Sequence, residues 1–186
     1  MDSGIRGGVV RTVAGLLVLV GGLSSLAAVG PQSALDRVQD GFVLTIDPAP
    51  LAHRTVVTPT GSFAVLSAGD SVPRPTVGLP ALPTYRHLFG MPQGTTPRVT
   101  VLGYEVEELL LEDLGVRFPV MPTQPPISKS ARPDDIVFQW NAAAYAQDAF
   151  DTVALAAVTK SGDMRGVGIG ALVISPFRYN PAAGVL

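Results

Sequence analysis

Short runs of hydrophobic and β-branched residues, each closed by Gly, Pro or Asp, recur through most of the chain. Clear examples lie at residues 41–46, 53–58 and 62–66. Runs that are rich in Val, Thr and Phe and separated by turn residues are typical of strands in a sandwich or barrel. Prolines gather in 71–83 and 118–133, which we expect to be extended surface loops. The pattern predicts an all-β fold, a β-sandwich with Pro-rich loops.

The middle of the chain continues this pattern with longer connections. Residues 85–89 and 98–111 are predicted strands, joined by a hairpin-like connection over 91–97. The residues at 105–113 include good helix formers, but the positions before them alternate as in a strand. We therefore expect a strand here that runs into a loop.

The last part of the chain predicts a short strand at 137–140 and one helical turn within 141–150. Residues 152–160 and 165–174 have the composition of two paired strands. Turn-forming residues at 161–163 lie between them, so we expect a hairpin.

Residues 1–30 carry a different pattern. Arg6 and Arg11 precede an uncharged apolar run over 12–23, and small residues fill most of 24–30. A basic start, an apolar core and a small-residue end are the three parts of a secretory signal peptide. The sequence therefore predicts an N-terminal hydrophobic signal helix and an exported protein, located in the periplasm, at the cell surface or outside the cell.

The signal segment leaves two points open. Cleavage after Ala27 and cleavage after Ala28 both fit the small-residue pattern, and the sequence does not choose between them. An uncleaved anchor is the alternative, because 12–30 holds 19 residues without charge, close to the ~20 that cross a bilayer. The glycines within the apolar run favour cleavage. In either case the only expected membrane contact is through this segment.

Composition narrows the class of protein further. The 186 residues include 20 Gly and 17 Pro, are 47% hydrophobic and 15% charged, and carry a net charge of -2. This excludes a coiled coil or helical bundle, a disordered chain, and a basic nucleic-acid-binding domain. The chain has no cysteine, so it contains neither a thiol nucleophile nor a thiolate metal site.

The search for catalytic or cofactor chemistry finds little. His53 and His87 each lie on a predicted strand without a second ligand nearby, where a surface or structural role is commoner. The glycines of 166–170 have the wrong spacing for a phosphate loop and are better explained as strand glycines that a large side chain approaches. The carboxylates of 105–113 lack the spacing of a calcium loop. We expect no active site, metal or cofactor.

The order of the Gly and Pro positions carries a more specific signal. Gly-Leu-Pro-Ala-Leu-Pro at 78–83, Met-Pro-Thr-Gln-Pro-Pro at 121–126 and a closing Pro-Phe-Arg-Tyr-Asn-Pro at 176–181 follow one another in the chain. Together they resemble the propeptides of gingipain-type cysteine peptidases, which belong to the caspase-like clan. The residues that carry this resemblance are Gly78, Pro80, Pro83, Gly94, Pro122, Gln124, Pro125, Pro126, Tyr145, Asp148, Phe150, Arg165, Gly166, Pro176, Phe177, Tyr179 and Pro181.

The resemblance implies a role. In this family an exported precursor carries a β-sandwich propeptide ahead of a caspase-like catalytic domain. The propeptide keeps that domain latent, assists its folding and is removed on activation. The resemblance covers about 78–186 and matches the region before 71 only loosely. Together with the signal pattern and the strand pattern, it gives the expected domains: a signal peptide at 1–30, N-terminal strands of the prodomain or a linker at 31–70, with 31–40 as a short linker, and a propeptide domain at 71–186. The expected partner is the cognate cysteine peptidase domain of the same precursor. The chain itself is expected not to be an enzyme.

A latency propeptide blocks a cleft with a loop, and some gingipain propeptides place a basic side chain in the specificity pocket. The basic residues in or beside predicted loops are Lys129, Arg132, Lys160 and Arg165. Lys160 and Arg165, on the predicted hairpin, are the residues we favour from the sequence, although an ordinary surface charge explains each of the four as well.

Two further expectations concern the whole molecule. Residues 180–186 have the pattern of a turn that launches a strand, so we expect the reading frame to be partial at this end. The alternative function is a free-standing secreted β-sandwich that binds or adheres to a ligand. Such a module would need an exposed aromatic platform, and the chain has one Trp and four Tyr.

Overall fold

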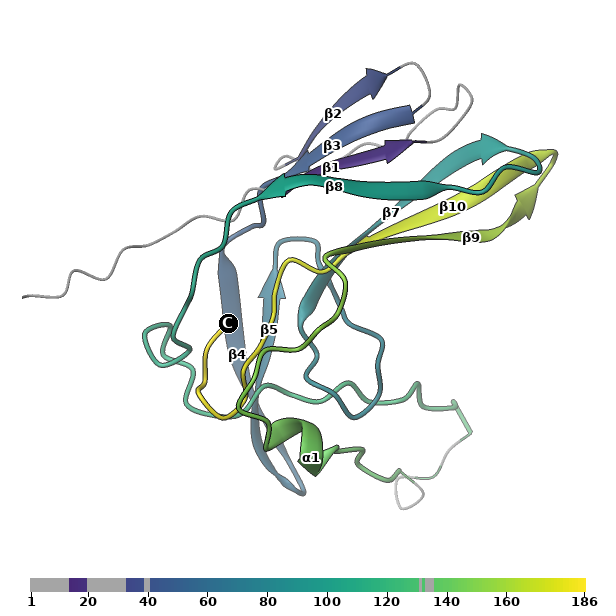
Figure 1. Cartoon of the computed structure of the whole chain (residues 1–186). Helices are drawn as coiled ribbons and strands as arrows, with labels where there is room; N and C mark the ends of the chain where they lie inside the picture. The colour runs from purple at the N-terminus through teal and green to yellow at the C-terminus, as the bar shows by residue number, and fades with distance from the viewer. Residues whose placement is uncertain (1–13, 20–32, 39–40, 131, 133–135) are drawn as a thin grey trace, which may run out of the picture.

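The computed structural model describes residues 14–19, 33–38, 41–130, 132 and 136–186 (Figure 1). Its elements are β1 (Ala14–Leu19), β2 (Ser33–Val38), β3 (Gly41–Ile46), β4 (Leu51–Thr58), β5 (Gly61–Ala68), β6 (Val72–Pro73), β7 (Pro83–Pro92), β8 (Arg98–Tyr104), α1 (Ala142–Tyr145), β9 (Ala156–Met164) and β10 (Val167–Ile174). The predicted all-β class is confirmed for this part of the chain.

Two four-stranded sheets lie against each other (Figure 1). The strand order is β2-β3-β1-β8 in the first sheet and β6-β7-β10-β9 in the second, and neighbouring strands are antiparallel. The hairpin of β4 and β5 forms a separate two-stranded sheet beyond one end of this sandwich. We call this hairpin, with the segments 109–122 and 175–186, the hairpin lobe.

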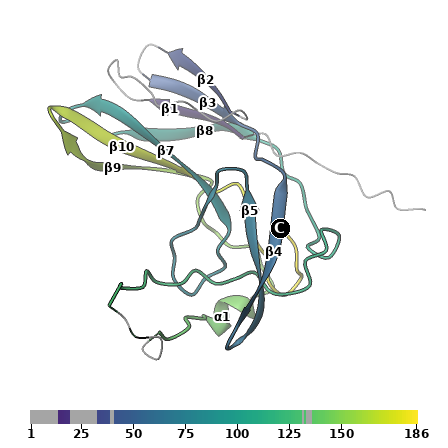
Figure 2. The same ribbon diagram turned by 180° about the vertical axis from the view of Figure 1, so that it is seen from behind.

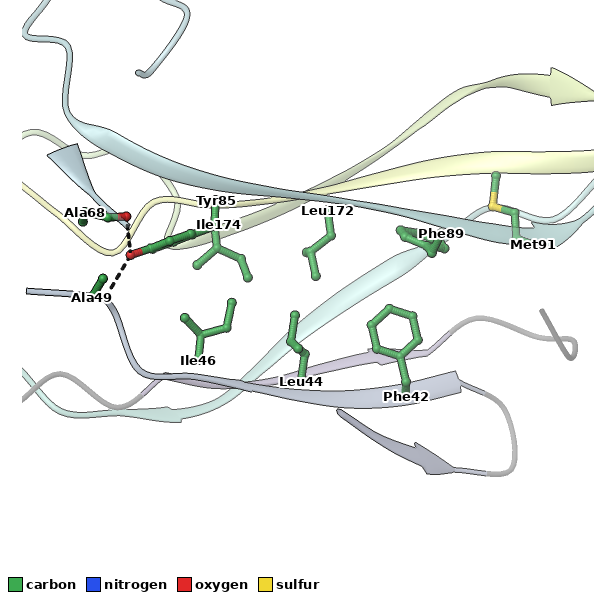
Figure 3. Close-up of a cluster of buried hydrophobic side chains, with 10 residues drawn as sticks. All are labelled: Phe42, Leu44, Ile46, Ala49, Ala68, Tyr85, Phe89, Met91, Leu172 and Ile174. Atoms are coloured by element: carbon green, nitrogen blue, oxygen red, sulfur yellow. Dashed lines mark hydrogen bonds between the residues drawn. The ribbon is translucent and has the colours of Figure 1, made fainter. Parts of the chain in front are cut away.

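The core of the sandwich follows from the alternation in β3. Phe42, Leu44 and Ile46 are buried, and their side chains point toward β7 and β10 of the opposite sheet (Figure 3). There the Phe42 ring meets the Phe89 ring edge-on, at a centroid distance of 5.7 Å. Burying side chains of this size contributes about 1.5–3 kcal/mol each. This apolar layer holds the two sheets together.

The glycines of β10 make room for this core. A Cβ on Gly170 would collide with the Phe89 ring, and one on Gly168 would lie 3.0 Å from Cγ of Met91. Both glycines are buried. The interpretation of these residues as strand glycines approached by large side chains is confirmed.

Tyr85 joins the sandwich to the hairpin lobe. Its hydroxyl accepts a hydrogen bond from the Ala49 backbone N–H (3.1 Å) and donates one to the Ala68 carbonyl (3.2 Å) (Figure 3). Burial raises the pKa of Tyr85. The hydroxyl therefore keeps the proton that it donates.

A second apolar cluster fills the hairpin lobe. Its buried members come from β5 and from the loop segments that cross it: Ala64, Leu66, Leu82, Leu111, Val116, Val120, Tyr179 and Leu186. Two backbone hydrogen bonds fix one of these segments on β5, from Ala64 N to Pro119 O (2.9 Å) and from Met121 N to Ala64 O (2.7 Å). The Pro-rich segment 118–133 therefore begins on a buried base rather than wholly on the surface.

The N-terminal expectations need two corrections. Residues 33–38 form strand β2 at a sheet edge, so the linker interpretation of 31–40 is wrong for them. Asp36 and Arg37 are exposed on this strand, as charged residues on an edge strand can be. Within the predicted signal helix, Ala14–Leu19 is strand β1, because an apolar run without periodicity fits a strand as well as a helix. The rest of 1–30 lies outside the described residues. The helical structure in the described part is too short to cross a membrane.

The predicted hairpins differ in detail. β7 and β8 belong to different sheets, so residues 93–97 form a connection between sheets and the predicted hairpin there is wrong. β9 and β10 do form a hairpin, but the turn lies at Arg165 and Gly166 rather than at 161–163. Both turn residues have positive φ, 50° and 83°, as a two-residue hairpin turn requires.

Three further predictions concern the segments beside the sheets. β8 ends at Tyr104, so the predicted strand over 98–111 is too long: 105–109 is irregular and a turn follows at 111–115. The loop expected within 105–113 is confirmed, but it begins directly after Tyr104. The single helical turn is confirmed as α1. The predicted strand at 137–140 is wrong: this segment pairs with a side chain instead of a neighbouring strand.

Candidate functional site

A long loop leaves the hairpin lobe at residue 123 and returns at residue 140, immediately before α1. Both views show the described parts of this segment, 123–130 and 136–140, extending away from the rest of the molecule (Figure 1, Figure 2). We call 123–140 the projecting loop. Lys129 and Arg132 lie in it, and both are exposed. The loop therefore presents two basic side chains at a distance from the core.

Gly78 holds both ends of the projecting loop. Its N–H donates to the carbonyl of Thr123 (2.8 Å), and its carbonyl accepts from the N–H of Asn141 (3.1 Å). The Thr123 N–H in turn donates to the carbonyl of Leu79 (2.9 Å). Gly78 has φ +81°, a conformation that favours glycine, and it is buried. This gives the first glycine of the Gly-Leu-Pro motif a structural reason.

The side chain of Gln124 closes the neck of the loop. Its Oε1 accepts from the Gln139 backbone N–H (2.9 Å), and its Nε2 donates to the Gln139 carbonyl (2.9 Å) and to the Pro122 carbonyl (3.0 Å). The amide thus pairs with one residue across the loop as a neighbouring strand would. Pro125 and Pro126 follow directly, and proline fixes the backbone φ angle. The Gln124–Gln139 pairing and the two prolines therefore both restrict the backbone at the neck, where the two ends of the loop meet.

An aromatic cluster supports the return of the loop. The ring of Trp140 lies 5.0 Å from that of Phe63 and 4.5 Å from that of Tyr145, and the Phe138 ring lies 5.3 Å from Phe63. The Tyr145 hydroxyl donates to the Val120 carbonyl (2.6 Å). Burial raises the pKa of Tyr145, so this donor stays protonated. These rings pack on one another where the loop returns, and Trp140 remains 39% exposed.

An ion pair ties the remaining motifs together. Arg74 is buried and its Nη1 lies 3.1 Å from Oδ2 of Asp151, while its Nη2 donates to the Phe177 carbonyl (3.0 Å). The same Asp151 carboxylate accepts from the Tyr179 backbone N–H (3.3 Å). The closing motif is therefore bound to the segment that follows α1.

Asp148 makes a parallel connection. Its Oδ1 accepts from the side-chain amide of Asn180 (3.0 Å). Tyr145 and Asp148, which both carry the family resemblance, thus make contacts at two places. Tyr145 bonds to Val120, and Asp148 bonds to Asn180 of the closing segment. The motif residues near α1 serve to hold loops in position.

The four basic candidates fall into two separate places. Lys160 and Arg165 lie on the β9–β10 hairpin, whose turn is at the far end of the sandwich from the projecting loop (Figure 1). The Lys160 ammonium lies 2.7 Å from the Asp163 carboxylate, and Arg165 occupies the tight turn. Lys129 and Arg132 share the projecting loop. No single surface brings all four together.

The described residues define a class before any comparison: a β-domain that presents one clamped, basic loop. Within the described ranges, no three His, Asp or Glu side chains gather as a metal site would require. The backbone of Gln139 and the side chain of Arg74 make contacts that hold these segments and that sequence reasoning missed. Only the two prolines that flank Arg74 mark it in the sequence.

Comparison with known proteins identifies the family. The Propeptide_C25 profile matches residues 30–186. Lys-gingipains of Porphyromonas gingivalis, among them those of HG66 and strain W83, are 40% identical over 131 residues, which is 70% of this chain and 8% of their own length. The chain belongs to the Propeptide_C25 family, and it corresponds to the non-catalytic propeptide of a C25 cysteine peptidase.

Solved structures agree with this assignment. A structure concerned with the zymogenic latency of gingipain K from P. gingivalis superposes with a TM-score of 0.72 and 30% identity, covering 91% of both chains. A complex of the pro- and mature domains of RgpB from the same organism gives 0.67 at 20% identity, over 84% of this chain and 78% of that one. The second likeness concerns the fold alone.

Proposed function

We propose that this chain is the propeptide region of an exported, gingipain-like cysteine endopeptidase precursor. In this role it keeps the catalytic domain latent and assists its folding. Residues 1–30 act as the signal peptide, and the product reaches the periplasm, the cell surface or the medium. The gingipain K structure supports the latency role, since it is described by its zymogenic latency and is 30% identical to this chain.

The projecting loop is the element that we assign to the cleft of the peptidase. The observation that carries this assignment is the pairing of Gln124 with Gln139, which fixes the neck while leaving the tip exposed. A loop that is already held in one shape loses less entropy when it binds. The neighbouring prolines add to the same effect.

Lys129 is the residue that we place in the specificity pocket, with Arg132 second. Both are exposed on the projecting loop. Lys160 is a weaker candidate because its ammonium is paired with Asp163, and Arg165 because its backbone is confined to the hairpin turn. The relatives are named Lys-gingipain, which favours the lysine.

Inhibition in trans tests this function. The recombinant chain without residues 1–30 is expected to slow its own precursor's mature peptidase at or below micromolar concentration. Lys129→Ala should weaken the inhibition at least tenfold, and Lys160→Ala, as the matched lysine control, should leave it unchanged. No inhibition by the folded wild-type chain would sink the latency role. Equal loss in both variants would contradict the assignment of the loop.

A further inference from the structure

The last residues of the chain pair antiparallel with the segment that follows β8, through an isolated bridge between Leu110 and Val185. Leu186 and Leu109 exchange two backbone hydrogen bonds, each of 2.9 Å, and the Leu111 N–H donates to the carbonyl of Gly184 (2.9 Å). This is the pattern of an antiparallel pair with Leu109 opposite Leu186. Leu186 is buried in the hairpin lobe. The direction of the chain at this point is thus set by backbone pairing.

Within the described ranges, no strand pairs with the edge that continues from this pair. Among the described residues, no backbone group of 105–108 takes part in a hydrogen bond. A cavity of about 770 Å³ lies beside the segment, and it is lined in part by apolar side chains of Leu109, Phe150, Phe177 and Leu186. A buried carboxylate oxygen of Glu107 has no partner there. An extended edge next to an apolar hollow is the arrangement that accepts an added strand.

The same edge leads into the slot between β3 and β8. Strand β1 occupies that slot and is antiparallel to both neighbours, with Ala14 opposite Tyr104. A segment that continued from Leu186 along 105–108 would run in the same direction as β1. Since Tyr104 lies five positions before Leu109, the fifth residue after Leu186 would stand opposite Tyr104, where Ala14 lies in this structure.

The present occupant of the slot does not belong to the region shared by the family. The family profile begins at residue 30, whereas β1 is Ala14–Leu19, inside the proposed signal peptide. Removal of residues 1–30 would leave β3 and β8 each with an unpaired edge over the core. Such edges are a liability that folded proteins cover.

We propose that the edge at 105–109 and the slot between β3 and β8 take up the polypeptide that follows Leu186 in the precursor. This inference rests on the proposed function, in which the propeptide is continuous with a catalytic domain. The segment forms a strand that replaces β1 once the signal peptide has been removed. Residues directly across a sheet share a face, so the positions that pair with Phe42 and Leu44 must be apolar. The occupant therefore has apolar residues at alternate positions.

Cysteine pairs test the register in the whole precursor. Val106 and the third residue after Leu186 would form a non-hydrogen-bonded pair, whose short Cα separation allows a disulfide. Val106→Cys with a cysteine at that third residue should cross-link almost completely under mild oxidation. The same variant with a cysteine at the fourth residue, on the opposite face, should not. For this test the catalytic cysteine of the precursor is replaced by alanine, so that it cannot form a competing disulfide. The propeptide itself has no natural cysteine.

Hydrogen exchange gives a second readout. In the precursor without residues 1–30, the amides of Glu105 and Glu107 should be protected at least tenfold more than in the chain that ends at Leu186. Cross-linking in neither pair, or equally in both, would overturn the inference, as would unchanged exchange at these amides. Latency is measured separately, in the precursor that keeps its catalytic cysteine and carries no added cysteine. If that precursor is latent while the cross-link fails, this strand alone is refuted; if it is fully active, the latency role is refuted instead.

Discussion

The side-chain amide of Gln124 pairs with both backbone groups of Gln139, from Oε1 to the N–H and from Nε2 to the carbonyl, each at 2.9 Å. Fourteen residues of chain lie between them (139 − 124 − 1). One side chain therefore closes a loop that no strand pairing closes.

Removing this amide should loosen the projecting loop without unfolding the domain. Gln124→Ala removes two hydrogen bonds across the loop and a third to Pro122. Net hydrogen bonds are worth about 0.5–1.5 kcal/mol each, so the loss of the two that cross the loop predicts inhibition weakened about tenfold. Gln139→Ala is the matched control, because Gln139 contributes its backbone to the clamp. Inhibition constants for both variants check this. Equal effects of the two substitutions would show that the clamp is not what orders the loop.

The ion pair of Arg74 and Asp151 is predicted to support global stability. Arg74 is buried, with 7% of its side chain exposed, and removal of one partner leaves the other charge unpaired. Arg74→Ala should lower the free energy of unfolding by about 3–5 kcal/mol. Lys160→Ala removes an exposed pair and should cost less than about 1 kcal/mol. Urea unfolding measures both, and a small effect of Arg74→Ala would contradict the structural role of the pair.

The core of the sandwich should reject a methyl group at Gly170. A Cβ there collides with the Phe89 ring, and overpacking of this kind costs about 1–3 kcal/mol. Gly103→Ala is a matched strand control, since nothing lies within 4 Å of its added Cβ. Thermal unfolding compares the two. In the Gly170→Ala protein, the further substitution Phe89→Leu removes the ring and should restore part of the lost stability. If it restores none, the ring is not the obstacle.

The burial of His87 predicts that the folded protein loses stability in acid. Burial lowers its pKa below the ordinary 6.5, an effect that the charge of Asp70 partly opposes. The unfolded chain therefore binds a proton more readily than the folded one, and stability falls as the pH drops below about 6.5 until the folded pKa is passed. His87→Gln should remove this component, while His53→Gln, at an exposed position, should keep it. Unfolding free energies between pH 7 and pH 5 test this, and identical slopes in all three proteins would exclude it.

Local sequence pattern predicted the strands well where burial alternates. In β3 the apolar positions Phe42, Leu44 and Ile46 face the core, so period and burial agree. The pattern failed for β2, where charged residues on an exposed edge resembled a linker. It also failed for the connection between β7 and β8, because which sheet a strand joins depends on contacts far along the chain.

The candidate site was only partly predictable for the same reason. The Gly-x-Pro and Gln-Pro-Pro motifs located the residues, but the contact of Gly78 with both Thr123 and Asn141 is formed only in the folded chain. Likewise Arg74 and Asp151 are 77 positions apart (151 − 74). The neighbouring sequence does not distinguish Lys129 of the projecting loop from Lys160 of the hairpin. Their different environments arise only in the folded chain.

The most direct test of the central claim is the reactivity of a single thiol at the tip of the projecting loop. The chain has no cysteine, so Lys129→Cys and Lys160→Cys each carry one thiol. Alkylation rates are measured with and without the mature peptidase, at concentrations where binding is saturated. The account predicts at least tenfold protection at position 129, none at 160, and release of the protection by an active-site inhibitor. Binding that protects position 160, or that leaves 129 fully reactive, would contradict it.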